Sequence, residues 1–91
     1  MTARFIDNAE KNRFEYHVGT SFAYANYRRK GKELFIDKVE APVELRGTGA
    51  AGNLMQNIVG LAKAEGLVIV PVCSYAAAWM QRRQKPRAPK P

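Results

Sequence analysis

The sequence contains one cysteine and one histidine, and this shortage excludes several classes of protein. A single thiol, Cys73, cannot form an internal disulfide, and one thiol with one imidazole, His17, does not make a Cys/His metal site. No apolar run approaches the roughly 20 residues that a membrane-spanning helix needs. The first residues, MTARFIDNAEK, also lack the apolar stretch of a signal peptide. We therefore expect no bound metal, no membrane association and a reducing, cytoplasmic location.

Acidic residues are few as well, 8 against 15 lysines and arginines, which gives a net charge of +7. Five of the positive charges lie in the last ten residues, RRQKPRAPKP, so residues 1–81 carry only +2. The prolines in this segment oppose a regular helix or strand. We predict one domain at 1–81, large enough for a modest core, and a flexible basic tail at 82–91. Attraction of this tail to nucleic acid is an alternative that we do not favour.

The first half of the chain alternates apolar and polar residues with the period of half-buried strands. The clearest case is RFEYHV at 13–18, where His17 takes a surface or packing position. The stretch SFAYANYRRKGKELFIDKV then predicts strands at about 21–28 and 33–39, joined by a glycine-containing basic loop. A short strand at about 3–6 precedes them. These strands indicate an antiparallel meander.

The second half changes character. Apolar residues at helical spacing predict a helix over 48–65 that ends at Gly66. LVIVPV at 67–72 is a short continuous apolar run, as expected of a buried parallel strand, and SYAAAWMQRR predicts a last helix capped by Ser74. The order is therefore β-β-β-β-α-β-α, an α/β fold with a mixed sheet. A right-handed crossover would place strand 67–72 beside strand 33–39.

The segment GTGAAG at 47–52 matches the G-x-G-x-x-G spacing of dinucleotide-binding folds. A glycine-rich helix start presents open N–H groups and the positive end of the helix dipole, which suits phosphate; otherwise it is a connection that binds nothing. Dinucleotide binding is excluded because residues 40–46 separate the preceding strand from Gly47. The following strand also ends in VPVCS, without the acid that holds the ribose. A Walker loop is excluded because no Gly-Lys-Ser/Thr occurs.

Beginning at Arg46, RGTGAA fits the pattern Arg/Gln-x-x-Gly-x-Gly/Ala. Together with the preceding PVEL and the following VPVCSY, it resembles the GCN5-related N-acetyltransferases, especially their very short single-domain members. The resemblance covers about residues 4–83. It implies that backbone N–H groups of this segment cradle the pyrophosphate of coenzyme A. The residues concerned are Arg46, Gly47, Thr48, Gly49, Ala50 and Ala51.

The same resemblance implies that strands 33–39 and 67–72 splay apart and hold the pantetheine arm between them. The acetyl group would lie near Val39, Glu40 and Ala41 on one side and near Val72, Cys73 and Ser74 on the other. Acetyl-CoA or coenzyme A is then the cofactor, and the reaction is transfer of acetyl to an amine by direct attack in a ternary complex.

Acetyl transfer needs a group that accepts a proton from the amine, and a carboxylate can serve when burial raises its pKa. Glu40 is the first candidate, with a solvated loop carboxylate as the alternative, and Glu44 is the second. Cys73 lies where a strand becomes a helix, a place that can stabilise a thiolate. It either forms an acyl-cysteine or is a small packed residue. The short acetyltransferases that the chain resembles also carry a cysteine here.

Many acetyltransferases carry a tyrosine in the last helix that protonates the leaving thiolate, and this sequence has Trp79 near that place. Indole N–H is not a usable acid, so Tyr75, one turn earlier, is the candidate for this role or else a core residue.

The acceptor amine is unidentified. Phe22, Tyr24 and Tyr27 either line its site or belong to the core. Larger relatives have N-terminal helices that help to form this site, and here it is either open or completed by a partner, such as a second copy of the chain. A non-catalytic module that binds or senses coenzyme A is the first rival function. The second is a basic nucleic-acid adaptor, which we do not favour because no stacking platform is visible.

Overall fold

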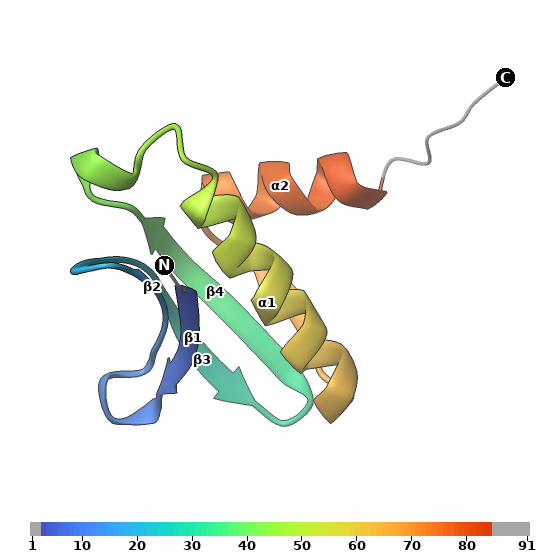
Figure 1. Ribbon diagram of the computed structural model, residues 1–91. Coiled ribbons are helices and arrows are strands. Elements are labelled where there is room, and N and C mark those ends of the chain that lie inside the picture. Colours follow the sequence, from blue (N-terminus) through green and yellow to red (C-terminus); the bar gives the residue numbers. More distant parts are fainter. Residues whose placement is uncertain (1–2, 85–91) are drawn as a thin grey trace, which may run out of the picture.

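Strands and helices follow one another in the predicted order (Figure 1). The computed structural model describes residues 3–84. The strands are β1 (Ala3–Asn8), β2 (Arg13–Val18), β3 (Ser21–Lys30), β4 (Glu33–Glu40) and β5 (Val68–Pro71). The helices are α1 (Ala50–Glu65) and α2 (Ser74–Gln84), with short 3-10 helices η1 (Ala9–Lys11) and η2 (Val43–Leu45).

The strands form one sheet in the order β1-β2-β3-β4-β5. β1 to β4 pair antiparallel as a meander, and β5 pairs parallel to β4 after the crossover through α1. The predicted mixed sheet is therefore confirmed. Neither α-helix of residues 3–84 is long and apolar enough to cross a membrane.

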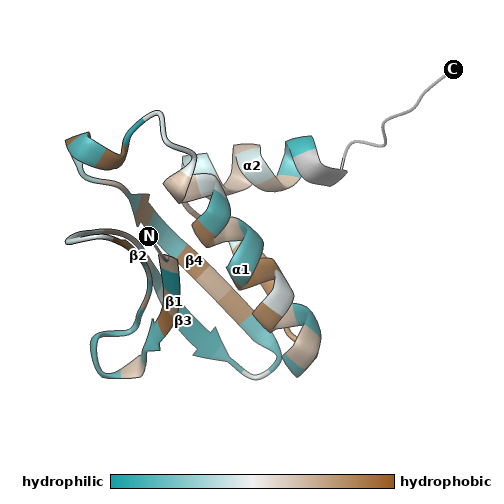
Figure 2. Ribbon diagram, in the orientation of Figure 1, coloured by the Kyte–Doolittle hydropathy of each residue, from teal (hydrophilic) through white to brown (hydrophobic). Residues whose placement is uncertain are grey.

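The core lies between the sheet and α1. Leu54, Met55 and Ile58 of α1 are fully buried, since their spacing places them on one face of the helix. They pack in one cluster with Phe14 of β2 and Ile36 of β4. Figure 2 shows apolar residues of α1 and β4 next to one another. Burying each large side chain stabilises the fold by about 1.5–3 kcal/mol.

α1 begins two residues later than the sequence predicts, whereas α2 begins at Ser74, the first residue of the predicted segment, but with a different cap. α1 begins at Ala50 rather than at 48, because Gly47 and Gly49 have left-handed φ values of 81° and 86°. In α2 the carbonyl of Cys73 accepts the first helical bond from Ala77 N–H at 2.9 Å, which makes Cys73 the cap residue. The prediction that Ser74 caps this helix is therefore wrong.

The ends of both helices are also defined. Gly66 ends α1 as predicted, with a left-handed φ of 68° and its N–H donating to the Lys63 carbonyl at 3.3 Å. α2 continues to Gln84, so residues 82–84 of the predicted tail belong to this helix. The rest of that segment, residues 85–91, lies outside the described residues.

β4 contains a bulge that the sequence analysis does not predict. Ile36 pairs with Tyr27 of β3, but Lys38 pairs with the adjacent Asn26, so Asp37 is an extra residue. A bulge bends a strand and exchanges its two faces. The inward positions of β4 consequently change from even to odd numbers at this point.

Candidate functional site

The glycine turn, residues 46–52, joins η2 to α1 and leaves several backbone N–H groups open. Within residues 3–84, no hydrogen bond from the N–H groups of Gly47, Gly49, Ala51 or Gly52 is present. The first N–H groups of a helix have no intrahelical acceptor and, with the helix dipole, favour an anion. A Cβ built at Gly47 or Gly49 would meet no heavy atom within 4 Å, so the space beside the turn is open. This arrangement fits a phosphate group.

Three other N–H groups of the predicted cradle are already used inside the turn. Arg46 N–H donates to the Val43 carbonyl at 3.1 Å, and Thr48 N–H donates to the Leu45 carbonyl at 3.2 Å. Ala50 N–H donates to Thr48 Oγ1 at 3.2 Å. The N–H groups that stay open are therefore the alternate ones at Gly47, Gly49 and Ala51, together with that of Gly52. Gly52 lies outside the set of residues that the resemblance implies, although its place in the first helical turn is a signal that identifies it.

The Thr48 side chain braces this turn. Its hydroxyl donates to the Leu45 carbonyl at 2.6 Å while accepting the Ala50 N–H bond. Arg46 lies beside it with an exposed side chain, and its Nε donates to the Ala41 carbonyl at 3.3 Å. That contact places a guanidinium between the glycine turn and the end of β4.

The fork is the place where β4 and β5 stop pairing. The last parallel pair is Ile36 with Pro71, and the N–H groups of Val72 and Cys73 both donate to the Ile36 carbonyl at 3.0 Å. β4 continues to Glu40, while the segment after β5 turns away into α2. Within residues 3–84, no strand pairs with that side of β4 beyond Ile36, so its backbone edge is open there.

The predicted residues beside the thioester flank this fork. Val39 and Ala41 on the β4 side are half-buried and pack against the core. On the other side, Val72 is 56% exposed and Ser74 is exposed. Cys73 is a half-buried free thiol at the start of α2, between β5 and the first helical turn. The fold thus brings both predicted groups of residues to one place.

Glu40 ends β4 on the face of the sheet opposite Val39. Its carboxylate accepts a hydrogen bond from the Tyr24 hydroxyl at 3.4 Å and lies 3.9 Å from Lys38 Nζ. The side chain is 54% exposed. The structure therefore presents Glu40 as a solvated carboxylate beside the fork rather than as a buried one.

The two aromatic residues of α2 differ in position. Tyr75 lies in the first turn of α2 and is 36% exposed. Trp79 is half-buried, and its Nε1 lies 3.7 Å from the place that a Cβ on Gly52 would occupy. The indole therefore packs against the first turn of α1, next to the open N–H groups, and a Cβ at Gly52 would lie in ordinary van der Waals contact with it.

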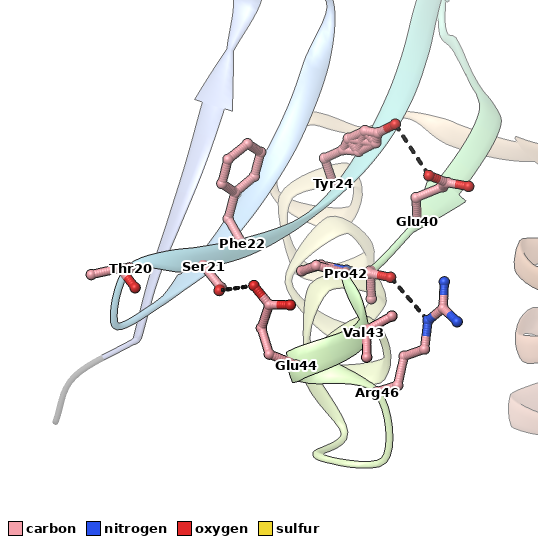
Figure 3. A pocket seen from close by; sticks show the side chains of 10 residues that line it. Thr20, Ser21, Phe22, Tyr24, Glu40, Pro42, Val43, Glu44 and Arg46 are labelled. Atoms are coloured by element: carbon pink, nitrogen blue, oxygen red, sulfur yellow. Dashed lines mark hydrogen bonds between the residues drawn. The ribbon is translucent and has the colours of Figure 1, made fainter.

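A pocket of about 510 Å³ lies on the face of the sheet away from α1. Phe22 and Tyr24 point into it because they alternate along β3 with the buried Ala23 and Ala25. Tyr27 belongs to the buried set instead, 5% exposed in the core. Figure 3 shows the pocket between β3, the end of β4 and η2. It is lined by Thr20, Ser21, Phe22, Tyr24, Glu40, Ala41, Pro42, Val43, Glu44 and Arg46.

A buried carboxylate lies outside this site. Glu15 of β2 is 5% exposed and accepts hydrogen bonds from Asn8 at 3.0 Å and Arg13 at 2.7 Å, and it lies 2.8 Å from His17 Nε2. Burial alone would raise its pKa, but these hydrogen bonds outweigh burial and lower the pKa of Glu15 to about 2. His17 also stacks on Phe22, with 4.8 Å between ring centroids. His17 therefore has a packing role, one of the two that its alternation predicts.

No three histidine, cysteine or acidic residues of the described chain come together in a way that could hold a metal ion.

Comparison with known families matches residues 13–88 to a family model described as GCN5-related N-acetyl-transferase. The matched range begins with β2 and includes the glycine turn, the fork and α2. No curated protein matches the chain.

Proposed function

Since this chain belongs to the GCN5-related N-acetyltransferase family, we propose that it binds acetyl-CoA and transfers the acetyl group to an amine. The observation that carries the proposal is the set of open N–H groups at Gly47, Gly49, Ala51 and Gly52 beside an empty space. Its position next to the fork lets one elongated ligand reach both. The proposed location is the cytoplasm, as the single cysteine suggests.

The chain would hold the ligand at two points. Open N–H groups of the glycine turn would bind the pyrophosphate, with the Arg46 guanidinium beside them. The open edge of β4 beyond Ile36 would pair with the amide groups of the pantetheine arm, as an added strand would. Val39 and Ala41 would then flank the thioester from β4, and Val72, Cys73 and Ser74 from the opposite side.

Acetyl-CoA supplies an acetyl group activated as a thioester. We propose direct attack in a ternary complex: the N–C bond forms as the C–S bond breaks, the amine loses one proton and the departing sulfur gains one. Although Glu40 is not buried, we assign it as the proton acceptor, directly or through a water, because its accessible carboxylate ends β4 beside the fork. Tyr75 is the proton donor to sulfur because it lies beside Cys73 and Ser74 in the first turn of α2.

Cys73 offers a covalent alternative. Its half-buried thiol at the helix start could accept the acetyl group first and pass it to the amine. Acid-quenched protein analysed by mass spectrometry after mixing with acetyl-CoA distinguishes the two routes. Direct attack predicts no acetylated Cys73 on the time scale of turnover, whereas the covalent route predicts a transient acetyl adduct that Cys73→Ala abolishes.

A second candidate function, a non-catalytic module that binds coenzyme A, is favoured by one observation. The position where a tyrosine acid is expected holds Trp79, packed against Gly52. This module would bind acetyl-CoA as tightly as the enzyme but acetylate no amine in a broad panel.

Calorimetric titration with acetyl-CoA tests the proposal, using two glycine variants of matched backbone strain. Gly49→Ala and Gly31→Ala both place a Cβ at a left-handed residue, with φ of 86° and 60°, so both lose comparable stability. Only the first adds an atom to the cradle. Saturable binding by the parent protein and Gly31→Ala, weakened in Gly49→Ala, supports the proposal. Absence of binding by the folded parent protein, or equal binding by both variants, contradicts it.

A further inference from the structure

The pocket beside the fork carries an inference about the acceptor, which rests on the proposed function. It opens on the face of the sheet away from α1, and Glu40 at the end of β4 belongs to its wall. A molecule in this pocket would therefore reach the predicted thioester position from the side opposite the core. Figure 3 shows Phe22 and Tyr24 on β3, Glu40 beside Tyr24 at the end of β4, and Glu44 and Arg46 at η2 and directly after it.

The aromatic side of the pocket is fixed by packing. Phe22 and Tyr24 lie edge to face with 6.3 Å between centroids. The Arg13 guanidinium lies against both rings from the side of β2, at 5.2 Å and 5.3 Å, and is itself held by Glu15 at 2.7 Å. Aromatic faces attract alkyl chains and cations. Because Arg13 already supplies the cation beside both rings, this side of the pocket suits the carbon chain of a ligand rather than its charged end.

Among the lining residues two carboxylates outnumber one cation, and Lys38, which is not a lining residue, has its Nζ 3.9 Å from Glu40. Glu40 and Glu44 come from separate elements, the end of β4 and η2, and Arg46 is the one cation among the lining residues. Arg46 Nε is engaged with the Ala41 carbonyl at 3.3 Å, at the rim next to the glycine turn. Because Arg46 already has this acceptor, the carboxylates of Glu40 and Glu44 favour a ligand with two ammonium groups over a ligand that carries a carboxylate.

Glu44 is held in a fixed direction. Its Oε2 accepts a hydrogen bond from the Ser21 hydroxyl at 2.8 Å, which ties η2 to the start of β3. The carboxylate accepts one hydrogen bond from the backbone N–H of Glu44 and one from the Ser21 hydroxyl. Both bonds lower the pKa of Glu44, so it stays ionised at neutral pH. Its exposed position leaves acceptor capacity on the carboxylate for a ligand.

We propose that the acceptor is a compact diamine that spans this pocket between two carboxylates. Glu40 lies beside the amine that reacts, and Glu44 pairs with the second ammonium, which keeps its proton and takes no part in the transfer. The carbon chain between the two nitrogens lies on the rings of Phe22 and Tyr24. Glu44 is then a specificity-determining residue and not a catalytic one.

Acetylation of 1,4-diaminobutane and of 1-aminobutane at saturating acetyl-CoA tests this assignment. The two amines have the same chain length and differ only in the second nitrogen. We expect a KM about fivefold lower for the diamine, the upper range for a solvent-accessible ion pair, with similar kcat. Glu44→Gln should remove this difference in KM. The control Glu33→Gln removes an exposed carboxylate at the other end of β4 and should preserve it.

Equilibrium binding of the same two amines, followed by NMR with and without coenzyme A, separates this inference from the proposed function. Preferred diamine binding that Glu44→Gln abolishes supports the pocket even in a protein that fails to bind acetyl-CoA, and only the proposed function is then lost. Equal binding of both amines, or a preference that Glu44→Gln leaves unchanged, overturns the inference. Acetyl-CoA binding without transfer to the diamine overturns it as well.

Discussion

Two regions of the molecule differ in how far their polar groups are paired. The first is the meander of β1 to β4, and the second is the unit formed by the end of β4, α1, β5 and α2. In the meander, buried or half-buried polar side chains find partners within the protein. Glu15 has Asn8, Arg13 and His17 around it, and the Tyr27 hydroxyl donates to Asp7 at 2.6 Å. In the second unit, backbone N–H groups of the glycine turn and the edge of β4 stay open.

This difference separates stability from function along the chain. Buried polar groups cost free energy unless they are paired, so a satisfied meander stabilises the fold. Open N–H groups at a helix start add nothing to the stability of the ligand-free protein, but they bind an anion without rearrangement. Substitutions in the meander should therefore change stability first, and substitutions in the second unit should change ligand binding first.

The largest effect on stability is expected from Phe14→Ala. Phe14 is fully buried and stacks on Phe5 and Tyr27, with centroids 5.6 Å and 4.2 Å away. Truncating such a ring costs about 3–5 kcal/mol, which is a large part of the stability of a small domain. Urea-induced unfolding measures the loss. The control Val43→Ala removes a side chain that is 72% exposed and should change stability by less than about 0.5 kcal/mol. Equal losses would contradict the assignment of the core.

Acid sensitivity from Glu15 is the next effect. Its pKa is about 2 in the folded protein and 4.5 in the reference state, so the unfolded chain binds a proton more readily. The stabilisation is therefore complete above pH 4.5 and is lost as the pH falls towards about 2. It amounts to about 3 kcal/mol. Urea unfolding across this pH range should show a shallower pH dependence in Glu15→Gln than in the parent protein. Identical slopes would show that Glu15 is not the linked group.

Thr48→Val tests the brace of the glycine turn and should have a smaller effect. The substitution keeps the shape but removes the hydroxyl that bonds the Leu45 carbonyl and the Ala50 N–H. We expect a loss of about 1 kcal/mol in unfolding free energy, together with weaker acetyl-CoA binding because the cradle loses its shape. Thr20→Val, in the exposed turn before β3, is the control. Weaker stability without any change in ligand binding would remove Thr48 from the site.

The smallest effect is expected from the exposed ion pair between β3 and α1. Arg29 and Glu65 approach to 2.9 Å, but their side chains are 38% and 45% exposed. A double-mutant cycle with Arg29→Gln and Glu65→Gln should give a coupling of about 0.2–1 kcal/mol that decreases with added salt. A larger coupling that is independent of salt would mean that the pair is shielded from solvent.

The sequence predicts the order of elements because periodicity is strong in both halves. Alternation predicts β2, and the spacing of Leu54 and Ile58 predicts α1. The bulge at Asp37 was missed, although the spacing of Ile36 and Val39 already breaks the alternation. The start of α1 differs from the prediction because a glycine pattern does not fix the φ values at Gly47 and Gly49. The burial of Glu15 depends on Asn8 of β1 and on Arg13 and His17 of β2, whose side chains surround its carboxylate. A local sequence pattern does not contain this information.

For the candidate site, the resemblance points to the glycine turn and the fork, and the structure shows that these segments lie together and which of their N–H groups are open. Alternating use of the N–H groups in the turn follows from left-handed φ values at Gly47 and Gly49. The sequence predicts only part of the pocket lining. Phe22 and Tyr24 were candidates for the acceptor side, but the contribution of Ser21 and η2 depends on the contact between Ser21 and Glu44, which are far apart in the chain.

The measurement that tests the central claim most directly is a titration of ¹⁵N-labelled protein with acetyl-CoA, followed residue by residue in ¹H–¹⁵N spectra. We predict saturable shifts at Gly47, Gly49, Ala51 and Gly52 and along β4 from Lys38 to Glu40, with the amide of Glu15 unchanged. Shifts confined to the meander, or no shifts in a folded sample, would contradict the claim that the glycine turn and the fork form the acetyl-CoA site.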